Sequence, residues 1–484
     1  MIEPSQRQRT LVLAICCISL LIVSLDNTVL NVALPSMRQD LGASVAGMQW
    51  TIDAYTLVMA SLLMLAGSTA DRIGRRKVFV TGLILFTLGS LLCSLAPGLG
   101  WLITFRMVQA VGAAMLNPVA ISIITNTFTD PAERARAIGI WGAVAGLSMA
   151  AGPVIGGVLV DSVGWRSIFW VNLPIGLVAL WLTLRHVPDS RAAHARRPDP
   201  VGQLLIMGLL GSLTYGIIEA PAAGLGSPLI LACGLVAVAS LVGLLLYEPR
   251  REEPLIDLRF FRSAPFSGAT VCAVSAFAAL SGFLFLNTLY LQDVRGLSAL
   301  HAGLYMVPMA GLTLLFAPLS GRLTGSRGPR LPLLIAGGAM GASGLLFAAF
   351  SAETSTPLMF AGFMLFGLGF GMVNAPITNT AVSGMPRSQA GVAAAVAATS
   401  RQTGGTLGVA VIGAVLAAGT AGGGEFTAAA KPAYWIITVC GLLVLLVGAA
   451  TNGRWARETA LRTAAALEPD PPGQGSAPVG APRS

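Results

Sequence analysis

The 484-residue chain is 55% hydrophobic and only 11% charged, and its mean hydropathy is +0.76. Apolar runs recur along its whole length, which excludes an ordinary soluble domain and indicates a polytopic membrane protein. The net charge of +9 is spread over short segments between these runs. A basic excess placed in this way favours the charge asymmetry of membrane topology over nucleic-acid binding, and no nucleic-acid partner is expected.

Residues that could bind a metal or a cofactor are scarce. All six cysteines fall in apolar runs without metal-ligand spacing, and the three histidines lie at or beyond the ends of runs. The sequence has no phosphate-binding loop of the form G-x-x-x-x-G-K-[ST], no H-E-x-x-H pair and no nucleophile elbow. We therefore expect neither an enzyme nor an ATP-driven pump, and we predict no cofactor and no metal site.

The apolar runs predict an all-α membrane protein with fourteen transmembrane helices. In chain order, we expect these helices at residues about 11–34, 48–70, 78–96, 101–125, 137–160, 167–184, 201–220, 229–246, 266–290, 302–323, 331–350, 357–380, 390–418 and 434–450. Their spacing suggests two six-helix bundles with an extra helix pair between them.

The predicted organisation has five parts. These are a cytoplasmic N-terminus (1–10), a first six-helix bundle (11–184), two accessory helices with cytoplasmic loops (185–265), a second six-helix bundle (266–450) and a disordered cytoplasmic tail (451–484). The end of the tail, from about Glu468, is rich in Pro, Gly, Ala and Ser, a composition that cannot build a packed core.

The distribution of basic residues predicts which ends of the helices face the cytoplasm. With the N-terminus placed in the cytoplasm, only four of the 30 lysines and arginines fall outside, two fall within helices, and the other 24 fall on the cytoplasmic side. The four outside are Arg38, Arg166, Arg295 and Lys431. Positive residues concentrate in cytoplasmic loops, so both termini are predicted to be cytoplasmic, with the protein in the cell membrane.

Three ionisable side chains are predicted deep within the first bundle. At about 1.5 Å of rise per residue, Asp26 lies about 12 Å below the outer surface, and Asp53 and Arg106 lie about 8 Å below it. A charged residue at the centre of a transmembrane helix costs at least about 2.5–3.5 kcal/mol, so it often marks the path of an ion or substrate. An aspartate stays ionised beside an arginine and takes up a proton in an apolar cavity. These three residues are candidates for proton coupling, with Asp26 as the principal carboxylate.

Simpler roles stay open for these acids. Asp26 could be only a structural partner of Arg106, and Asp53 could lie at the lipid headgroup boundary. Glu219 is expected to be an interfacial residue of the accessory helices. Asp161 and Asp293 are expected to be loop acids at the outer surface.

A glycine-led, arginine-rich loop follows the second helix. It contains Gly67, Asp71, Arg72, Gly74, Arg75 and Arg76. Because Asp71 can pair with a facing arginine or a helix N-terminus, the loop predicts a conformational latch, although a loop that only sets topology fits the same charges. A second copy at residues 321–330 has Gly325 in place of Asp71, so its latch is expected to be weak. Parallel repeats of this kind are typical of secondary transporters.

The fifth helix contains a cluster of small residues around a proline. It comprises Gly152, Pro153, Gly156 and Gly157. Small residues let membrane helices approach closely, and proline removes one backbone hydrogen bond. This segment is therefore predicted to pack tightly and to allow bending or sliding.

Several segments together resemble one family. The loop from Gly67 resembles the inner-loop signature of the major facilitator superfamily, and the cluster from Gly152 resembles the motif of its proton-coupled antiporters. Residues 106–114 resemble the family's proton-linked arginine motif, with Ala110 where glycine is usual. Further matching segments surround Asp26 and cover residues 50–55, 164–176, 291–303 and 401–408. Residues 11–450 are thus similar to the fourteen-helix drug:proton antiporters of the QacA/EmrB type.

The resemblance implies a proton-coupled antiporter that exports lipophilic drugs or antibiotics across the cytoplasmic membrane. Its partners would be protons, the lipid bilayer and a lipophilic small molecule, and an acid in the cavity would suit a cationic one. Candidates for contact with substrate or between bundles are Asn27, Gln109, Arg401 and Gln402. A proton-coupled uptake symporter and a non-transporting receptor or scaffold are the alternatives. The cluster at Gly152 argues against symport, and a scaffold would have no use for buried charge.

Overall fold

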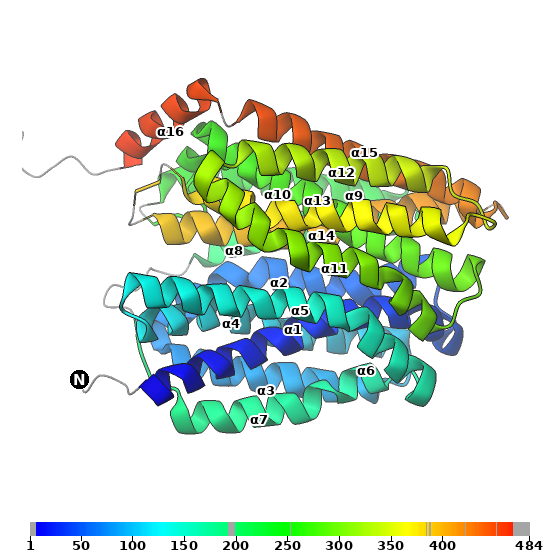
Figure 1. The fold of residues 1–484 in the computed structure, drawn as a ribbon, viewed down its shortest axis with the longest axis horizontal. Coiled ribbons are helices and arrows are strands. Elements are labelled where there is room, and N and C mark those ends of the chain that lie inside the picture. The colour runs from blue at the N-terminus through cyan, green and yellow to red at the C-terminus, as the bar shows by residue number, and fades with distance from the viewer. Residues whose placement is uncertain are drawn as a thin grey trace, which may run out of the picture.

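The computed structural model describes residues 6–191, 199–251, 253–383, 385–386, 389–421, 423–451 and 453–467. Within these residues the regular secondary structure is helical, without strands, and fourteen helices are long and apolar enough to cross a membrane. The long helices run roughly parallel or antiparallel to one another (Figure 1). The predicted all-α fold with fourteen transmembrane helices is confirmed.

The first bundle contains six spans. Its helices are α1 (Gln6–Leu41), α2 (Val45–Ile73), α3 (Arg75–Ser94), α4 (Leu99–Thr127), α5 (Pro131–Val163), α6 (Ser167–Trp170) and α7 (Asn172–His186). The sixth span consists of α6 and α7, because the helix predicted at residues 167–184 is interrupted at Val171. Within this bundle α1 packs against α5, and α4 packs against α2 and α3.

The second bundle repeats this organisation. Its elements are α10 (Ala264–Leu289), the π-helix η3 (Tyr290–Val294), α11 (Ala299–Arg327), α12 (Arg330–Ala348), α13 (Thr356–Val382), α14 (Ala390–Thr420) and α15 (Phe426–Ala450). Here α12 packs against α15, α10 against α14, and α11 against α13. Helix α15 begins well before the predicted residue 434, so Lys431 and Pro432 lie inside it.

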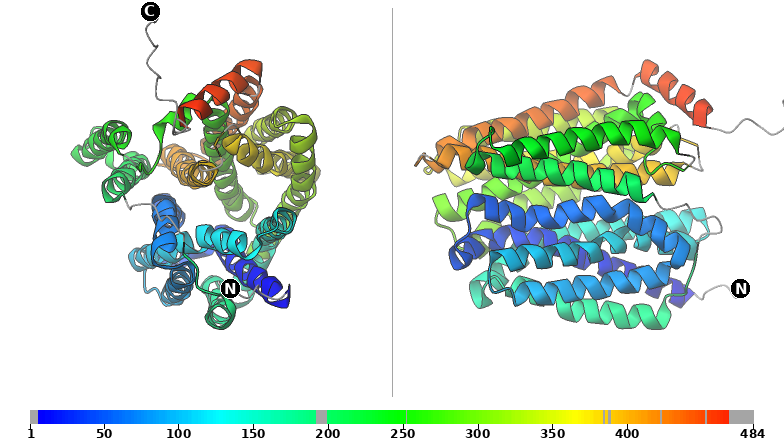
Figure 2. Two further views of the ribbon diagram at one scale, coloured as in Figure 1. Left: turned by 90° about the vertical axis from the view of Figure 1, so that its left-hand side faces the viewer. Right: turned by 180° about the vertical axis from the view of Figure 1, so that it is seen from behind.

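The accessory helices stand at one side of the two bundles. They are α8 (Pro200–Ala223) and α9 (Pro228–Tyr247), followed by the short 3₁₀ helices η1 (Glu248–Arg250) and η2 (Leu258–Arg262). Viewed along the helix axes, the pair projects from the rest of the molecule (Figure 2, left). Helix α8 packs against α2 and α14, and α9 packs against α8. The pair therefore covers the seam where α2 meets α14.

Part of the tail is ordered, contrary to the prediction of disorder for residues 451–484. Helix α16 (Arg454–Leu467) packs against α10 and η2. The hydroxyl of Thr459 accepts a hydrogen bond from the backbone nitrogen of Ala264, at the start of α10, at 3.0 Å. The buried face of α16 is built largely from small residues, which is why its sequence did not show the apolar runs used to find helices. Residues from Glu468 onward lie outside the described residues.

The aligned helices give the molecule two ends. The inner end carries the start of α1 and the loop between α2 and α3, and the outer end is opposite. The charge asymmetry predicts that the inner end is the cytoplasmic one.

Candidate functional site

Asp26 and Arg106 form a buried ion pair inside the first bundle. Asp26 Oδ2 lies 2.5 Å from Arg106 Nη1, and the residues are 4% and 0% exposed. Asp26 comes from α1 and Arg106 from α4, which pack against each other and bring the two side chains together. A buried ion pair is stable only if its remaining hydrogen-bonding groups are largely satisfied.

Two side-chain amides complete the surroundings of Asp26. Its Oδ1 accepts hydrogen bonds from Gln109 Nε2 and Asn172 Nδ2, both at 2.8 Å. These amides also donate to Ser90 Oγ, at 2.7 and 3.0 Å respectively. Gln109 is fully buried in this network, so it is not placed to meet a substrate in this conformation. Ser90 and Asn172 were not predicted as site residues. For Asn172, a lone amide in an apolar run is a signal that could have indicated a buried polar site.

Arg106 is held from two further sides. Its guanidinium carbon lies 4.1 Å from the ring centroid of Tyr55, within cation–π distance. Its Nε donates a hydrogen bond to the backbone oxygen of Thr51 at 3.3 Å. The charges of Asp26 and Arg106 thus compensate each other inside a nearly complete hydrogen-bond network.

Asp53 is buried in a very different environment. It is 0% exposed, and neither carboxylate oxygen has a hydrogen-bond partner among the described residues. The Thr56 side chain, on the next turn of α2, lies close enough to interact with this carboxylate, although the two do not meet hydrogen-bond geometry. Asp53 thus faces the interior of the protein rather than the lipid. Burying a carboxylate without hydrogen bonds or a counter-charge is unfavourable.

Polar contacts tie the two bundles together at the outer end, which we call the outer seal. Arg38 Nη1 lies 3.1 Å from Asp293 Oδ2. The carboxylate of Asp161, at the end of α5, accepts hydrogen bonds from the backbone nitrogens of Ala299 (3.2 Å) and Leu300 (3.0 Å). Asp161 thus supplies an anion to the N-terminus of α11, a favourable position for negative charge. Asp161 and Asp293 are not simple loop acids but members of this seal.

The seal continues along α2 and α14 toward the middle of the molecule. Gln49 Nε2 donates to the backbone oxygens of Val409 (3.1 Å) and Ala410 (2.9 Å). Two turns further, Thr406 donates to the hydroxyl of Thr56 at 2.9 Å. Asp53 lies between Gln49 and Thr56, one turn from each on the same side of α2. The unpartnered carboxylate is therefore placed on the stretch of α2 that closes against the second bundle.

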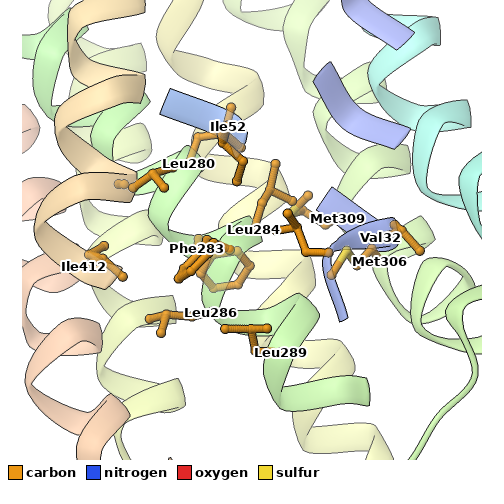
Figure 3. Packing of buried hydrophobic residues seen from close by; sticks show 14 of the residues in the cluster. Val32, Ile52, Leu280, Phe283, Leu284, Leu286, Leu289, Met306, Met309 and Ile412 are labelled. Atoms are coloured by element: carbon orange, nitrogen blue, oxygen red, sulfur yellow. The ribbon is translucent and has the colours of Figure 1, made fainter. Parts of the chain in front are cut away.

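Apolar side chains fill the interior behind these polar contacts. One buried cluster combines Val32 and Ile52 of the first bundle with Phe283, Met309 and many other residues of the second. Figure 3 shows these side chains gathered around α10. Dense apolar packing across the interface excludes water, which raises the cost of any charge that lies within it.

The glycine cluster of α5 allows close packing on two sides. A Cβ atom at Gly152 would lie 1.9 Å from Thr28 Oγ1 of α1, and one at Gly157 would lie 2.4 Å from the Cα atom of Leu300 of α11. From the other side, a Cβ atom at Gly303 would lie 2.2 Å from the backbone oxygen of Pro153. The cluster therefore contacts both α1 and α11, at the interface between bundles.

The arginine-rich loop makes contacts at the inner end. Asp71 pairs with Arg75 of its own loop at 3.0 Å, rather than with an arginine from a facing helix. The backbone nitrogen of Arg75 donates to Ser190 O at 2.9 Å, and Arg76 donates to the backbone oxygen of Leu184. The loop is thus fixed to the end of α7 and to the segment that leads to α8.

The internal repeat is visible in the backbone. Gly74 and Gly328, which occupy equivalent positions in the two copies, both have positive φ angles, +117° and +82°, where each ends a helix. Side chains rarely adopt this conformation, so glycine is required at both positions. The copies differ in their surroundings: a Cβ atom at Gly74 would lie 2.6 Å from Asp189 Oδ1, whereas Gly328 has open space around it.

The remaining candidates are divided among different environments. Gln402 Nε2 lies 3.5 Å from Met59 Sδ, across the bundle interface. Arg401 donates to Thr378 Oγ1 at 3.4 Å within the second bundle. Asn27 is partly exposed beside the ion pair, and its backbone oxygen accepts a hydrogen bond from Asn31. Glu219 accepts a hydrogen bond from Trp50 Nε1 at 2.7 Å, so it ties α8 to α2.

Two six-helix bundles that pack against each other, with charges buried at and near their interface, are typical of a membrane transporter rather than an enzyme. Residues 16–409 match the Major Facilitator Superfamily, and the chain belongs to this family. It is a multi-pass protein of the cell membrane.

Similar proteins support the same assignment. The chain is 39% identical over 412 residues to the multidrug resistance protein Stp of Mycobacterium tuberculosis, covering 85% of this chain and 76% of that protein. It is 37% identical over 401 residues to the tetracenomycin C resistance and export protein of Streptomyces glaucescens, covering 83% and 74%. A bacterial homologue of the human lysosomal transporter Spinster shares the fold, with a TM-score of 0.64, 19% identity, and 95% and 99% coverage.

Proposed function

We propose that this protein is a proton-coupled antiporter that exports lipophilic small molecules, such as drugs or antibiotics, from the cell. Its relatives include proteins named for multidrug resistance and for tetracenomycin C resistance and export. The buried acid Asp53 supplies a group that could exchange a proton during transport. The glycine cluster of α5, which contacts both bundles, supplies a surface on which they could move.

The position of Asp53 in the outer seal is the observation that carries the proposed coupling. An ionised carboxylate without partners is costly to bury, whereas the protonated acid is neutral and costs less. Closing α2 onto α14 over Asp53 should therefore favour a proton on this residue. Asp26, in contrast, has a cation and two amide donors around it in this conformation.

In the proposed cycle, Asp53 takes up a proton from outside while the outer seal is open. The neutral side chain then permits the seal to close, and the transport pathway becomes accessible from the cytoplasm. Loss of the proton to the cytoplasm and binding of substrate favour reopening to the outside. A ligand shifts a conformational equilibrium only by binding one state better than the other, and here the proton favours the closed seal.

The proposed roles of Asp26 and Asp53 differ from those expected from the sequence. Asp26 was the predicted principal proton carrier, and we now propose that it is a fixed partner that positions Arg106. Asp53 would be the group that gains and loses the proton. A carboxylate in this place also suits a lipophilic cation, because a cation and a proton would compete for the same acid.

Everted membrane vesicles offer the direct test. Vesicles with and without the protein would be given a panel of lipophilic dyes and antibiotics under an imposed pH gradient, acidic inside. We expect uptake into the vesicles that disappears when a protonophore collapses the gradient. Substrate uptake that does not depend on the pH gradient would contradict proton coupling. Proton-driven movement of substrate out of the vesicles would indicate symport.

A further inference from the structure

A second pair of buried acids lies outside the two bundles, at the inner end of the accessory helices. Asp199 caps the start of α8, where its Oδ1 accepts a hydrogen bond from the backbone nitrogen of Gly202 at 2.9 Å. Glu248 follows α9 as the first residue of η1. The packing of α8 against α9 brings the two acids together, although they are far apart in the sequence.

The two carboxylates point into one small space. Asp199 is 3% exposed and Glu248 is 0% exposed. A Cβ atom at Gly202 would lie 2.6 Å from Glu248 Oε1 and 2.9 Å from Asp199 Oδ2, so these two oxygens face the same position above the glycine. Neither oxygen has a hydrogen-bond partner among the residues that the structure describes.

The charges around the pair do not balance. The other described titratable or charged groups facing it are Arg251 and Tyr247. Arg251 Nε lies 3.8 Å from Asp199 Oδ2, and the hydroxyl of Tyr247 donates to Asp199 Oδ1 at 3.2 Å. In these described surroundings one cation faces two carboxylates. One bound proton would make the group of Asp199, Glu248 and Arg251 electrically neutral.

We propose that Glu248 and Asp199 form a proton-binding site that holds a single proton, separate from Asp53. Two carboxyl groups at one site rarely ionise together, because each charge disfavours the other. The proton belongs mainly to Glu248, since Asp199 already has Arg251, Tyr247 and the start of α8 as partners. The site needs only the residues named here, so it stands whether or not Asp53 couples transport to protons.

The location gives this proton a structural effect. Glu248 Oε2 accepts a hydrogen bond from the backbone nitrogen of Ile256 at 3.4 Å, in the segment that leads to the second bundle. Asp199 ends the segment that comes from the first bundle, whose Ser190 contacts the arginine-rich loop. The segments from both bundles thus meet at the acid pair. Ionisation of both acids at high cytoplasmic pH would push them apart and loosen this junction.

Infrared difference spectroscopy of the full-length protein in lipid nanodiscs can detect the proton. We expect a carbonyl band of a buried carboxylic acid that is lost in Glu248→Gln and kept in Glu458→Gln, a control on the exposed face of α16. Glu248→Gln should also be more heat-stable than wild type by a margin that grows as the pH rises. At high pH the buried Glu248 of wild type must either ionise or hold its proton, and both cost free energy, whereas glutamine does not titrate.

The outcomes are decisive for the site. Spectra of wild type and Glu248→Gln that coincide across the pH range would overturn the proposal, and so would a stability difference that does not depend on pH. A band that persists in Glu248→Gln but is lost in Asp53→Asn would place the proton at Asp53 alone. Should Glu248→Gln fail to fold, loss of the band in Asp199→Asn would support the pair, and an unchanged band would refute it.

Discussion

Asp26 and Asp53 lie in the same bundle, and both are removed from solvent, yet their surroundings are opposite. Asp26 has an arginine at 2.5 Å and accepts two amide hydrogen bonds, whereas neither oxygen of Asp53 has a partner among the described residues. A residue whose charge is compensated can stay charged through a conformational cycle. A residue without compensation is stable in the closed state only if its charge can be removed.

The depth of an acid in the membrane therefore does not by itself identify the proton carrier. By depth alone, Asp26 is the better candidate. The structure gives it a complete set of partners, and it places Asp53 on the stretch of α2 that packs against the second bundle. The arrangement of partners and the position relative to the interface therefore carry more information than depth.

Replacing Asp26 should have the largest effect. Asp26→Asn removes the negative charge opposite Arg106, and an uncompensated buried charge costs about 3–5 kcal/mol. We expect a clearly lower melting temperature together with loss of efflux. The double variant Asp26→Asn, Arg106→Gln should regain most of the stability but no transport. A stable, active Asp26→Asn protein would show that Asp26 is not a required partner of Arg106.

Replacing Asp53 should abolish proton coupling without lowering the stability of the protein. Asp53→Asn keeps the shape of the side chain and imitates its neutral form, so the melting temperature should equal or exceed that of wild type. Efflux driven by a pH gradient should fall to the background of vesicles without the protein. Substrate-induced proton release would be measured alongside it. Wild-type proton release in Asp53→Asn would return the coupling role to Asp26 or assign it to Glu219.

The loop at the inner end should affect turnover without affecting proton binding at the outer seal. Asp71→Asn removes the pair with Arg75 and should slow transport strongly while the protein still inserts in the membrane. Gly325→Ala, in the second copy, should have a smaller effect because open space surrounds Gly325. Initial transport rates at saturating substrate give the comparison. Equal rates for Asp71→Asn and wild type would show that Asp71 does not act as a latch.

A smaller effect is expected from the glycine cluster. Gly157→Ala should push α5 away from Leu300 of α11, and overpacking of this kind typically costs about 1–3 kcal/mol. The strain should weaken the outer seal and reduce efflux several-fold. Gly142→Ala is a matched control on the same helix, because nothing lies within 4 Å of its added Cβ atom. If both variants transported equally well, close packing at Gly157 would not matter for the cycle.

The sequence was sufficient for the fold and for part of the site. Apolar length located the spans, and counting residues from the outer surface placed Asp26 and Arg106 at similar depths. The rotation of one helix against another cannot be counted in this way. For that reason Ser90 and Asn172 were missed as partners of Asp26, and the isolation of Asp53 could not be foreseen.

The contacts of the outer seal also could not be predicted from the sequence. Asp161 and Asp293 lie at the ends of spans, as ordinary loop acids do, and only the docking of the bundles gives them partners. Gln49 drew no attention because its acceptors are backbone oxygens of α14, more than 350 residues away. Contacts to backbone atoms leave no pattern in the sequence of the accepting segment.

In the proposed cycle, closing the outer seal requires a proton on Asp53. This requirement can be tested by measuring the distance between spin labels at Val45 of α2 and Ala418 of α14 in nanodiscs, as a function of pH. We predict that the closed population of wild type rises as the pH falls, and that Asp53→Asn is closed at every pH. Asp26→Asn should keep the pH response if it remains folded. A wild-type pH dependence of this distance in Asp53→Asn would contradict the account.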